Sequence, residues 1–282
     1  MIEVDEGSVT DRTTKGPALH YAQAIPKNAK AVVAVLHGYA DHVGRYMHVF
    51  GALSEMGIGA IGVDLRGHGK AGGERGYCDS FTEFYDDAAE LHRLASDRAK
   101  QAGGVPLFVF GHSFGGLLVA RTIIDDPRDY KGAILGSPLL GLALEVPAIK
   151  VLAGKIASKI YPKLGLPSGL HGKDMTHDAA RAKAYDEDPL VFAQARARWF
   201  TEMQACAQEC EDGASRFELP LYMAFGTADP VNSFAAGKRF FETAASRDKT
   251  FDAREGKYHE LHNETDWKDL VEKYAKWILA HV

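Results

Sequence analysis

The sequence predicts an α/β fold in which helices flank a mostly parallel central sheet and a helical segment is inserted between two strands. Short runs rich in Val, Ile and Leu alternate with helical patterns, as in parallel sheets that are covered on both faces. From about residue 139 to residue 216 no buried strand pattern occurs, and the segment is typical of several helices. The alternation resumes at Pro220. The 282 residues are enough for one large domain with an insertion.

The segments before the insertion supply most of the expected sheet. The expected strands span residues 18–23, 31–36, 58–63, 107–110 and 132–136. The expected helices span residues 45–56 and 82–102, and a third starts around residue 117 and ends at residue 124. In the longest helix Phe84, Ala88 and Leu91 recur at helical spacing. Acidic residues come early in it and basic residues late, which matches the helix dipole.

The insertion contains a helical pattern whose environment the sequence leaves open. Between residues 145 and 164 apolar side chains recur at helical spacing, with a stripe of lysines beside them. The apolar positions are Ile149, Leu152, Ala153, Ile156, Ile160 and Leu164, and the lysines are Lys155, Lys159 and Lys163. The pattern favours a helix that packs its apolar face on the core. The alternative is a helix that lies on a lipid surface.

After the insertion the alternation of strand and helix continues. Strands are expected at residues 221–225 and 250–253, and helices at residues 234–244 and 267–280. We therefore expect a core domain of residues 1–138 and 217–282, and a helical cap of residues 139–216.

Composition and charge exclude several classes of protein. The chain has 46% hydrophobic residues and a net charge of -5, which gives no support for nucleic-acid binding. Its first dozen residues are acidic and lack an apolar core, and no stretch approaches the roughly 20 apolar residues of a membrane-spanning helix. Cys78, Cys206 and Cys210 form no disulfide framework, so a cytoplasmic location is expected.

Residues 107–116 are typical of a nucleophile elbow. An apolar strand runs into the Gly-x-Ser-x-Gly pattern of Gly111, Ser113 and Gly115, and a helical pattern follows at once. Glycines two residues to either side of the serine let strand and helix close on each other. The turn also places Ser113 near a helix N-terminus, where free N–H groups favour negative charge. The alternative is an ordinary turn that carries a surface serine.

A serine hydroxyl needs a base, and the carboxyl ends of the other strands supply candidates. In chain order these ends carry His37, Asp64, Ser113, Ser137 and Asp229, and a later loop carries His259. We predict Ser113 as the nucleophile and His259 as general base and then general acid, with Asp229 orienting the imidazole and stabilising its charged form. The alternatives are that Asp229 is only a turn residue before Pro230, and that His259 is a solvated histidine.

A tetrahedral intermediate also needs two N–H donors. Phe114 follows the nucleophile, and Tyr39 lies in the loop after the strand of residues 31–36, so we predict an oxyanion hole from these two backbone N–H groups. A zinc site at His259 and His262 is disfavoured, because the two residues are three apart rather than four.

Five motifs together resemble one family. They are His37-Gly38-Tyr39-Ala40-Asp41-His42-Val43-Gly44-Arg45-Tyr46, Asp64-Leu65-Arg66-Gly67-His68-Gly69, Gly111-His112-Ser113-Phe114-Gly115-Gly116, Ser137-Pro138-Leu139 and Gly226-Thr227-Ala228-Asp229. In this order, over about residues 19–277, they resemble the monoacylglycerol lipase and lysophospholipase branch of the α/β-hydrolases. The chain departs from the family pattern at Asp41, where Glu is usual, and at Ala71, where Ser is usual.

The resemblance implies the α/β-hydrolase fold with the triad and oxyanion hole named above and with a helical cap between the sixth and seventh core strands. It implies a serine carboxylic-ester hydrolase that needs no cofactor and cleaves monoacylglycerol to fatty acid and glycerol through an acyl-enzyme intermediate, with lysophospholipase activity beside it. We expect substrate contacts from five residues, which are His37, His112, Leu139, Ile149 and Leu152.

The same resemblance implies a lipid ester as substrate and a cap that touches a membrane surface transiently. We therefore expect a cytoplasmic protein that can lie peripherally at membranes. We also expect a monomer or weak homodimer without a nucleic-acid partner.

Other functions stay open at this point. A general short-chain carboxylesterase would share the motifs. A peptidase or amidase on this fold usually needs carboxylates that hold a free amino terminus, and the cap offers Glu187, Asp188, Glu209, Glu211 and Asp212. These carboxylates stand in charged surroundings typical of a solvated face. A non-catalytic binding protein is disfavoured because such proteins commonly lose the serine or the histidine, and this chain retains both.

Overall fold

The expected mostly parallel sheet is confirmed. The computed structural model describes residues 4–10, 16–143 and 148–282, and only the backbone of residues 148–153. Within that part of the chain, eight strands form one sheet in the order β1-β2-β4-β3-β5-β6-β9-β10. Their bounds are β1 Asp5–Val9, β2 Leu19–Ala24, β3 Ala31–Leu36, β4 Ile58–Val63, β5 Leu107–His112, β6 Ala133–Gly136, β9 Leu221–Gly226 and β10 Lys249–Arg254. The pairs β1–β2 and β2–β4 are antiparallel, and the other pairs are parallel.

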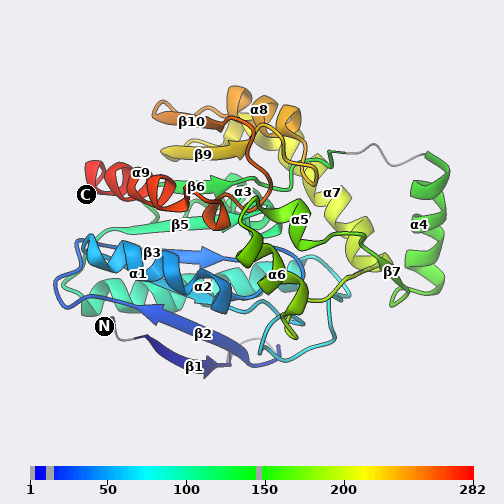
Figure 1. Ribbon diagram of the computed structural model, residues 1–282, viewed down its shortest axis with the longest axis horizontal. Helices are drawn as coiled ribbons and strands as arrows, with labels where there is room; N and C mark the ends of the chain where they lie inside the picture. The colour runs from blue at the N-terminus through cyan, green and yellow to red at the C-terminus, as the bar shows by residue number, and fades with distance from the viewer. Residues whose placement is uncertain (1–3, 11–15, 144–147) are drawn as a thin grey trace.

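Helices cover both faces of the sheet (Figure 1). α1 (Met47–Glu55) and α9 (Trp267–Ala280) pack on one face. α2 (Thr82–Gln101), α3 (Phe114–Asp125) and α8 (Phe234–Thr243) pack on the other. Every residue of β3, β4, β5 and β9 is buried, which explains their uninterrupted apolar sequences.

The elements between β6 and β9 lie at the end of the sheet where the parallel strands finish (Figure 1). They are α4 (Ala148–Ile160), β7 (Gly165–Pro167), α5 (Gly172–Met175), α6 (Ala179–Glu187), β8 (Gln194–Arg196), α7 (Ala197–Gly213) and η2 (Ala214–Arg216). We keep the name cap for residues 139–216, the predicted insertion. Within it α4 packs against α7, and α7 packs against α3 of the core.

The prediction that the first cap helix packs its apolar face on the core is wrong for the residues whose side chains are described. Ile156 is 51% exposed and Ile160 is 62% exposed, whereas Ser158 is buried. The Ser158 and Thr201 hydroxyls lie 2.7 Å apart, within hydrogen-bond distance, and link α4 to α7. Among the described side chains of the helix, Ser158 therefore faces α7, and Ile156 and Ile160 face outward. The side chains of Ile149 and Leu152 lie outside the described residues.

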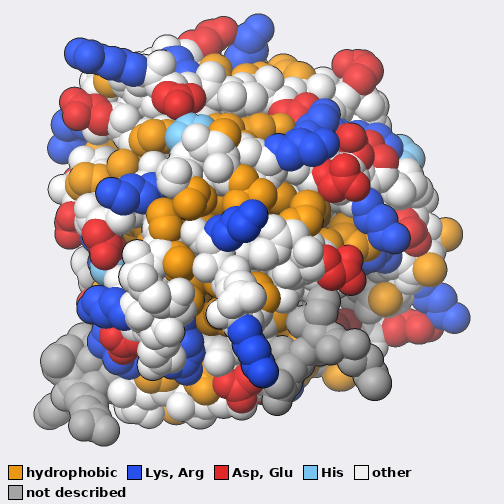
Figure 2. All heavy atoms as spheres, turned by 90° about the vertical axis from the view of Figure 1, so that its left-hand side faces the viewer, with side chains coloured by type: hydrophobic (Ala, Val, Ile, Leu, Met, Phe, Trp, Pro, Cys, Tyr) orange, Lys and Arg blue, Asp and Glu red, His pale blue; other side chains and the backbone are white. Residues whose placement is uncertain are grey.

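The face opposite the cap carries charges of both signs among its described residues. Figure 2 shows acidic and basic side chains interspersed around apolar ones on that face. In the described part of the chain, no helix is long and apolar enough to cross a membrane.

Candidate active site

The turn between β5 and α3 holds Ser113 in a strained backbone conformation. Its φ of 52° and ψ of -115° lie outside the regions that ordinary residues adopt. A Cβ atom at Gly111 would lie 2.4 Å from the Gly115 carbonyl oxygen, and one at Gly115 would lie 2.3 Å from the Leu36 carbonyl oxygen. Both glycines are therefore required by close backbone contacts, and this geometry is that of a nucleophile elbow.

The structure brings Ser113, His259 and Asp229 into one hydrogen-bonded chain. His259 Nδ1 lies 2.8 Å from Asp229 Oδ2, and His259 Nε2 lies 3.0 Å from Ser113 Oγ. An ionised carboxylate can only accept, so Nδ1 carries the proton and Ser113 donates to Nε2. The backbone N–H groups of Val231 and Asn232 donate to the other carboxylate oxygen, at 2.8 and 3.0 Å, and hold Asp229 in place. This chain can move the serine proton to the imidazole.

Burial and mutual attraction shift the pKa values of His259 and Asp229. Burial disfavours the imidazolium, but attraction to Asp229 and the hydrogen bond between them outweigh it and raise the pKa of His259 above its usual value. Burial likewise opposes ionisation of Asp229, but attraction to His259 and the hydrogen bonds it accepts lower its pKa. The carboxylate therefore stays ionised and stabilises the charged imidazole.

The two predicted oxyanion donors lie beside this chain. Phe114 is the first residue of α3, and Tyr39 lies in the loop that follows β3. Within the described residues, no hydrogen bond is formed by either N–H group, as a site for an oxyanion requires. The Tyr39 ring stacks on Trp199 of α7 with centroids 3.5 Å apart, and the Phe114 ring also contacts Trp199, at 5.5 Å. One cap side chain thus holds both donor residues.

The predicted substrate contacts with described side chains are packed around the nucleophile. His37 is buried, its Nε2 accepts from the Leu65 N–H at 3.0 Å, and its Nδ1 donates to the Gly38 carbonyl at 2.7 Å. Both ring nitrogens are therefore occupied, and the geometry favours a role in holding the loop after β3. That His37 touches substrate stays a prediction.

His112 and Leu139 are also buried. His112 Nδ1 donates to the Gly136 carbonyl at 3.1 Å, and burial together with repulsion from His259 lowers the pKa of His112 to about 4. The Leu139 N–H donates to the Ser113 carbonyl at 2.9 Å. Both residues support the elbow, and contact of their side chains with substrate stays a prediction.

Asn232 belongs to the site although the sequence analysis did not select it. Its side-chain amide donates to the Ser137 carbonyl at 2.8 Å and lies 3.4 Å from Ser113 Oγ. The available signal was its position three residues after Asp229, since an aspartate commonly accepts from the backbone two and three residues later.

The described cap carboxylates do not form a receptor for an amino terminus. Asp188 pairs with His42, Glu209 with Arg121, and Glu211 with Arg239, at 2.9, 2.8 and 3.3 Å. Glu187 pairs with Lys183 at 3.7 Å, and Asp212 accepts from Gln208 at 2.9 Å. Among the described residues, no cluster of His, Cys, Asp or Glu could hold a metal ion.

The chain is similar to known hydrolases over most of its length. The family model Hydrolase_4, described as serine aminopeptidase, S33, matches residues 27–266. The monoacylglycerol lipase of Mycolicibacterium smegmatis is 29% identical over 90% of this chain and 89% of that protein. An uncharacterized abhydrolase domain-containing protein of Dictyostelium discoideum is 30% identical over 89% of this chain, which spans 26% of that protein. The crystal structure of the Paleococcus ferrophilus monoacylglycerol lipase has a TM-score of 0.83 and 29% identity, and covers 94% of this chain and 99% of that one.

Proposed function

The chain belongs to the Hydrolase_4 (serine aminopeptidase, S33) family of α/β-hydrolases, and we therefore propose that it cleaves monoacylglycerol to fatty acid and glycerol. The observation that carries the chemistry is the hydrogen-bonded chain of Asp229, His259 and Ser113, beside two N–H groups that form no hydrogen bond with any described residue. The substrate class rests on the similarity to the monoacylglycerol lipases of M. smegmatis and P. ferrophilus.

The first half of the reaction transfers the acyl group to the enzyme. Ser113 Oγ attacks the ester carbonyl carbon while His259 Nε2 takes its proton. The N–H groups of Tyr39 and Phe114 hold the negative oxygen of the tetrahedral intermediate. His259 then gives the proton to the glycerol oxygen, the carbon–oxygen ester bond breaks, and the acyl group stays on Ser113.

The second half returns the enzyme to its starting state. A water molecule attacks the acyl-enzyme carbonyl while His259 takes one of its protons. The second tetrahedral intermediate collapses as His259 returns that proton to Ser113 Oγ, and the fatty acid leaves. Asp229 stays ionised in both halves and stabilises the imidazolium each time it forms.

Peptide or amide hydrolysis is the second candidate, because the family description names an aminopeptidase. The cap carboxylates considered for it are paired with neighbouring side chains, as described above, and in three of the pairs the carboxylate is exposed. An unpaired buried carboxylate would be expected in a site that binds a free ammonium group. The geometry therefore favours an ester substrate.

The exposed apolar residues of the cap support transient contact with a lipid surface. Five of them lie in α4, β7 and the segment between, namely Ile156, Ile160, Tyr161, Leu164 and Leu166. Lys155 and Lys159 are exposed beside them. Apolar side chains flanked by lysines suit the boundary between lipid head groups and acyl chains, so we propose that this surface touches the aggregate in which the substrate resides.

A substrate panel tests the function. Wild type and Ser113→Ala are compared on monoacylglycerols and p-nitrophenyl esters of rising chain length and on an aminoacyl amide. We expect fastest turnover of long-chain glycerol esters and a loss of several orders of magnitude in the variant. Turnover of short esters alone would identify a general carboxylesterase, and preference for the amide would support the peptidase alternative.

A further inference from the structure

A buried ion pair is attached directly to the loop that carries His259. Glu260 is the next residue and is 2% exposed. Arg45 grips its carboxylate with both terminal nitrogens, from Nη1 to Oε1 at 2.7 Å and from Nη2 to Oε2 at 2.6 Å. Such a two-pronged pair fixes orientation as well as distance.

The same guanidinium reaches the loop that carries the Tyr39 N–H. Arg45 Nη1 donates to Asp41 Oδ1 at 2.9 Å. Asp41 also accepts from the His42 N–H and from the Tyr46 hydroxyl, both at 2.8 Å. Since residues 37–46 form one segment after β3, Asp41, Arg45 and Glu260 join the oxyanion loop to the histidine loop. We call these three residues the charge bridge.

The charge bridge is held from the cap and from the histidine loop itself. The Asn263 side-chain amide donates to Glu260 Oε2 at 2.7 Å, and the Glu260 N–H donates to the Met175 carbonyl at 2.8 Å. The Arg45 guanidinium lies 4.8 Å from the ring centre of Tyr185 in α6. Both oxygens of the Glu260 carboxylate are thus engaged.

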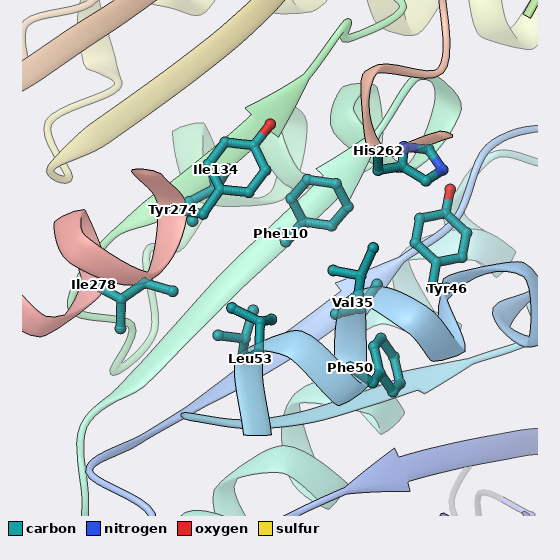
Figure 3. Close-up of a pocket in the computed structure, with 11 residues that line it drawn as sticks. Val35, Tyr46, Phe50, Leu53, Phe110, Ile134, His262, Tyr274 and Ile278 are labelled. Carbon is teal, nitrogen blue, oxygen red and sulfur yellow. The ribbon is translucent and has the colours of Figure 1, made fainter. Parts of the chain in front are cut away.

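Burial makes the charge bridge sensitive to the loss of one member, because Asp41, Arg45 and Glu260 are all largely hidden from solvent. The Tyr46 ring stacks on His262 with centroids 4.5 Å apart, and both residues border an internal cavity of about 20 Å³ lined by apolar side chains of β3, β5, α1 and α9 (Figure 3). Removal of one partner from a buried pair leaves the other charge without compensation.

Two carboxylates of the charge bridge also act on the catalytic imidazole through their charge. Burial disfavours the charged form of His259, and Asp229 is the largest of the interactions that raise its pKa, with Glu260 and Asp41 adding to it. The ring of His112 lies 4.8 Å from that of His259, and the ring of His262 lies 4.7 Å from that of His112.

These two neighbouring histidines are neutral near pH 7. Burial lowers the pKa of His112 to about 4 and lowers the pKa of His262 well below its usual value. The charges that act on His259 are therefore the carboxylates of Asp229, Glu260 and Asp41, and Arg45 is paired with the last two.

We propose that Glu260 is a positioning residue, which through Arg45 and Asp41 holds the loop of His259 against the loop of the Tyr39 N–H so that base and oxyanion donor keep their separation during turnover. This inference rests on the proposed function. Loss of Glu260 lets the two loops separate in the transition state while the substrate pocket stays in place, so the effect falls on kcat rather than on KM.

The test compares Glu260→Gln with a matched control. The glutamine side chain has the size of the native one, but its amide nitrogen cannot accept a hydrogen bond from Arg45. The control is Asp87→Asn, which weakens the pair in which Arg66 Nε and Nη2 donate to the buried Asp87 at 3.0 and 2.7 Å. Asp87 lies in α2, away from the loop that carries His259.

In Glu260→Gln we expect kcat to fall about 10- to 100-fold with KM within about twofold. We also expect the acidic limb of kcat/KM against pH to move to lower pH, because removal of a negative charge near His259 lowers the pKa of its imidazole. Asp87→Asn should lower the thermal midpoint and leave both kinetic readouts unchanged. Rates are taken per active site, titrated with a long-chain organophosphonate that reacts with Ser113.

The inference is overturned if Glu260→Gln loses thermal stability like the control while kcat and the acidic limb match wild type. If Glu260→Gln does not fold, Arg45→Lys replaces it, since a lysine keeps the charge but cannot grip both carboxylates. Because that variant keeps every charge, its readout is kcat alone, and a wild-type kcat would be equally decisive against the inference. Failure of the wild type itself to cleave monoacylglycerol would instead reject the proposed function.

Discussion

The close contact at Gly115 allows one prediction to be worked out from the structure. A Cβ atom added there would lie 2.3 Å from the Leu36 carbonyl oxygen and 2.6 Å from the His37 carbonyl oxygen, whereas ordinary contact begins at 3.4 Å. In Gly115→Ala the start of α3 and the end of β3 must separate by the difference, about 1.1 Å. Those carbonyls immediately precede the loop of Tyr39, so the separation moves the N–H of Tyr39 away from that of Phe114.

The expected loss of activity follows from that displacement. Displacement of a catalytic group by about 1 Å lowers the rate roughly 100-fold, and complete loss of one oxyanion donor lowers it about 100- to 1000-fold. We therefore expect kcat to fall about 100- to 1000-fold on a water-soluble ester. Forced overpacking should also lower the free energy of unfolding by about 1–3 kcal/mol.

The assay measures kcat, KM and the thermal midpoint of Gly115→Ala beside Gly154→Ala. Among the described residues, apart from its chain neighbours and the backbone of its own helix, no heavy atom lies within 4 Å of a Cβ built at Gly154 in α4. This control should therefore keep wild-type kcat and gain slightly in stability. A Gly115→Ala protein with wild-type kcat and an unchanged midpoint would refute the packing argument for the elbow.

Two further predictions concern charge and the cap surface. Activity needs neutral His259, whose pKa Asp229 raises against the effect of burial, so kcat/KM should fall as the pH drops through that pKa. In Asp229→Asn this acidic limb of the pH profile should move to lower pH, and kcat should drop about 10,000-fold. An acidic limb that stays in place would contradict the assigned pair of Asp229 and His259. Replacement of the exposed Ile156 and Ile160 by Ser should weaken binding to phospholipid vesicles and slow the hydrolysis of dispersed monoacylglycerol. Rates on a water-soluble ester should stay unchanged. If the variant binds vesicles as well as wild type does, the support for lipid contact is removed.

The sheet core was predictable because burial leaves a local mark on the sequence. β3 and β4 are buried along their whole length, and each has an unbroken apolar run. β1 lacks such a mark, because Asp5–Val9 is an exposed edge strand that is defined by pairing with β2. The three-residue strands β7 and β8 are equally exposed and short.

The orientation of α4 shows a different limit. The periodicity of the apolar residues locates a face of the helix, but it does not say whether protein or solvent lies against that face. The side that packs on α7 is the small polar one, with Ser158 next to Thr201, so the choice depended on a neighbour 43 residues away in the chain.

The candidate site likewise combines residues that the sequence predicts with residues that it does not. Ser113, Asp229 and His259 stand at the ends of predicted strands or in the loop after one, so topology alone placed them at one edge of the sheet. Arg45 and Glu260 are 215 residues apart, and their pairing leaves no local pattern that could have been read from the sequence. The catalytic roles assigned to these residues stay predictions until they are measured.

Covalent labelling tests the central claim most directly. A long-chain alkyl phosphonate ester resembles the tetrahedral intermediate and phosphonylates an activated serine. The account predicts one label for each chain, located on Ser113 by peptide mass spectrometry, with monoacylglycerol hydrolysis lost in proportion to labelling. Full hydrolytic activity in the labelled protein, or a label on another residue, would contradict it.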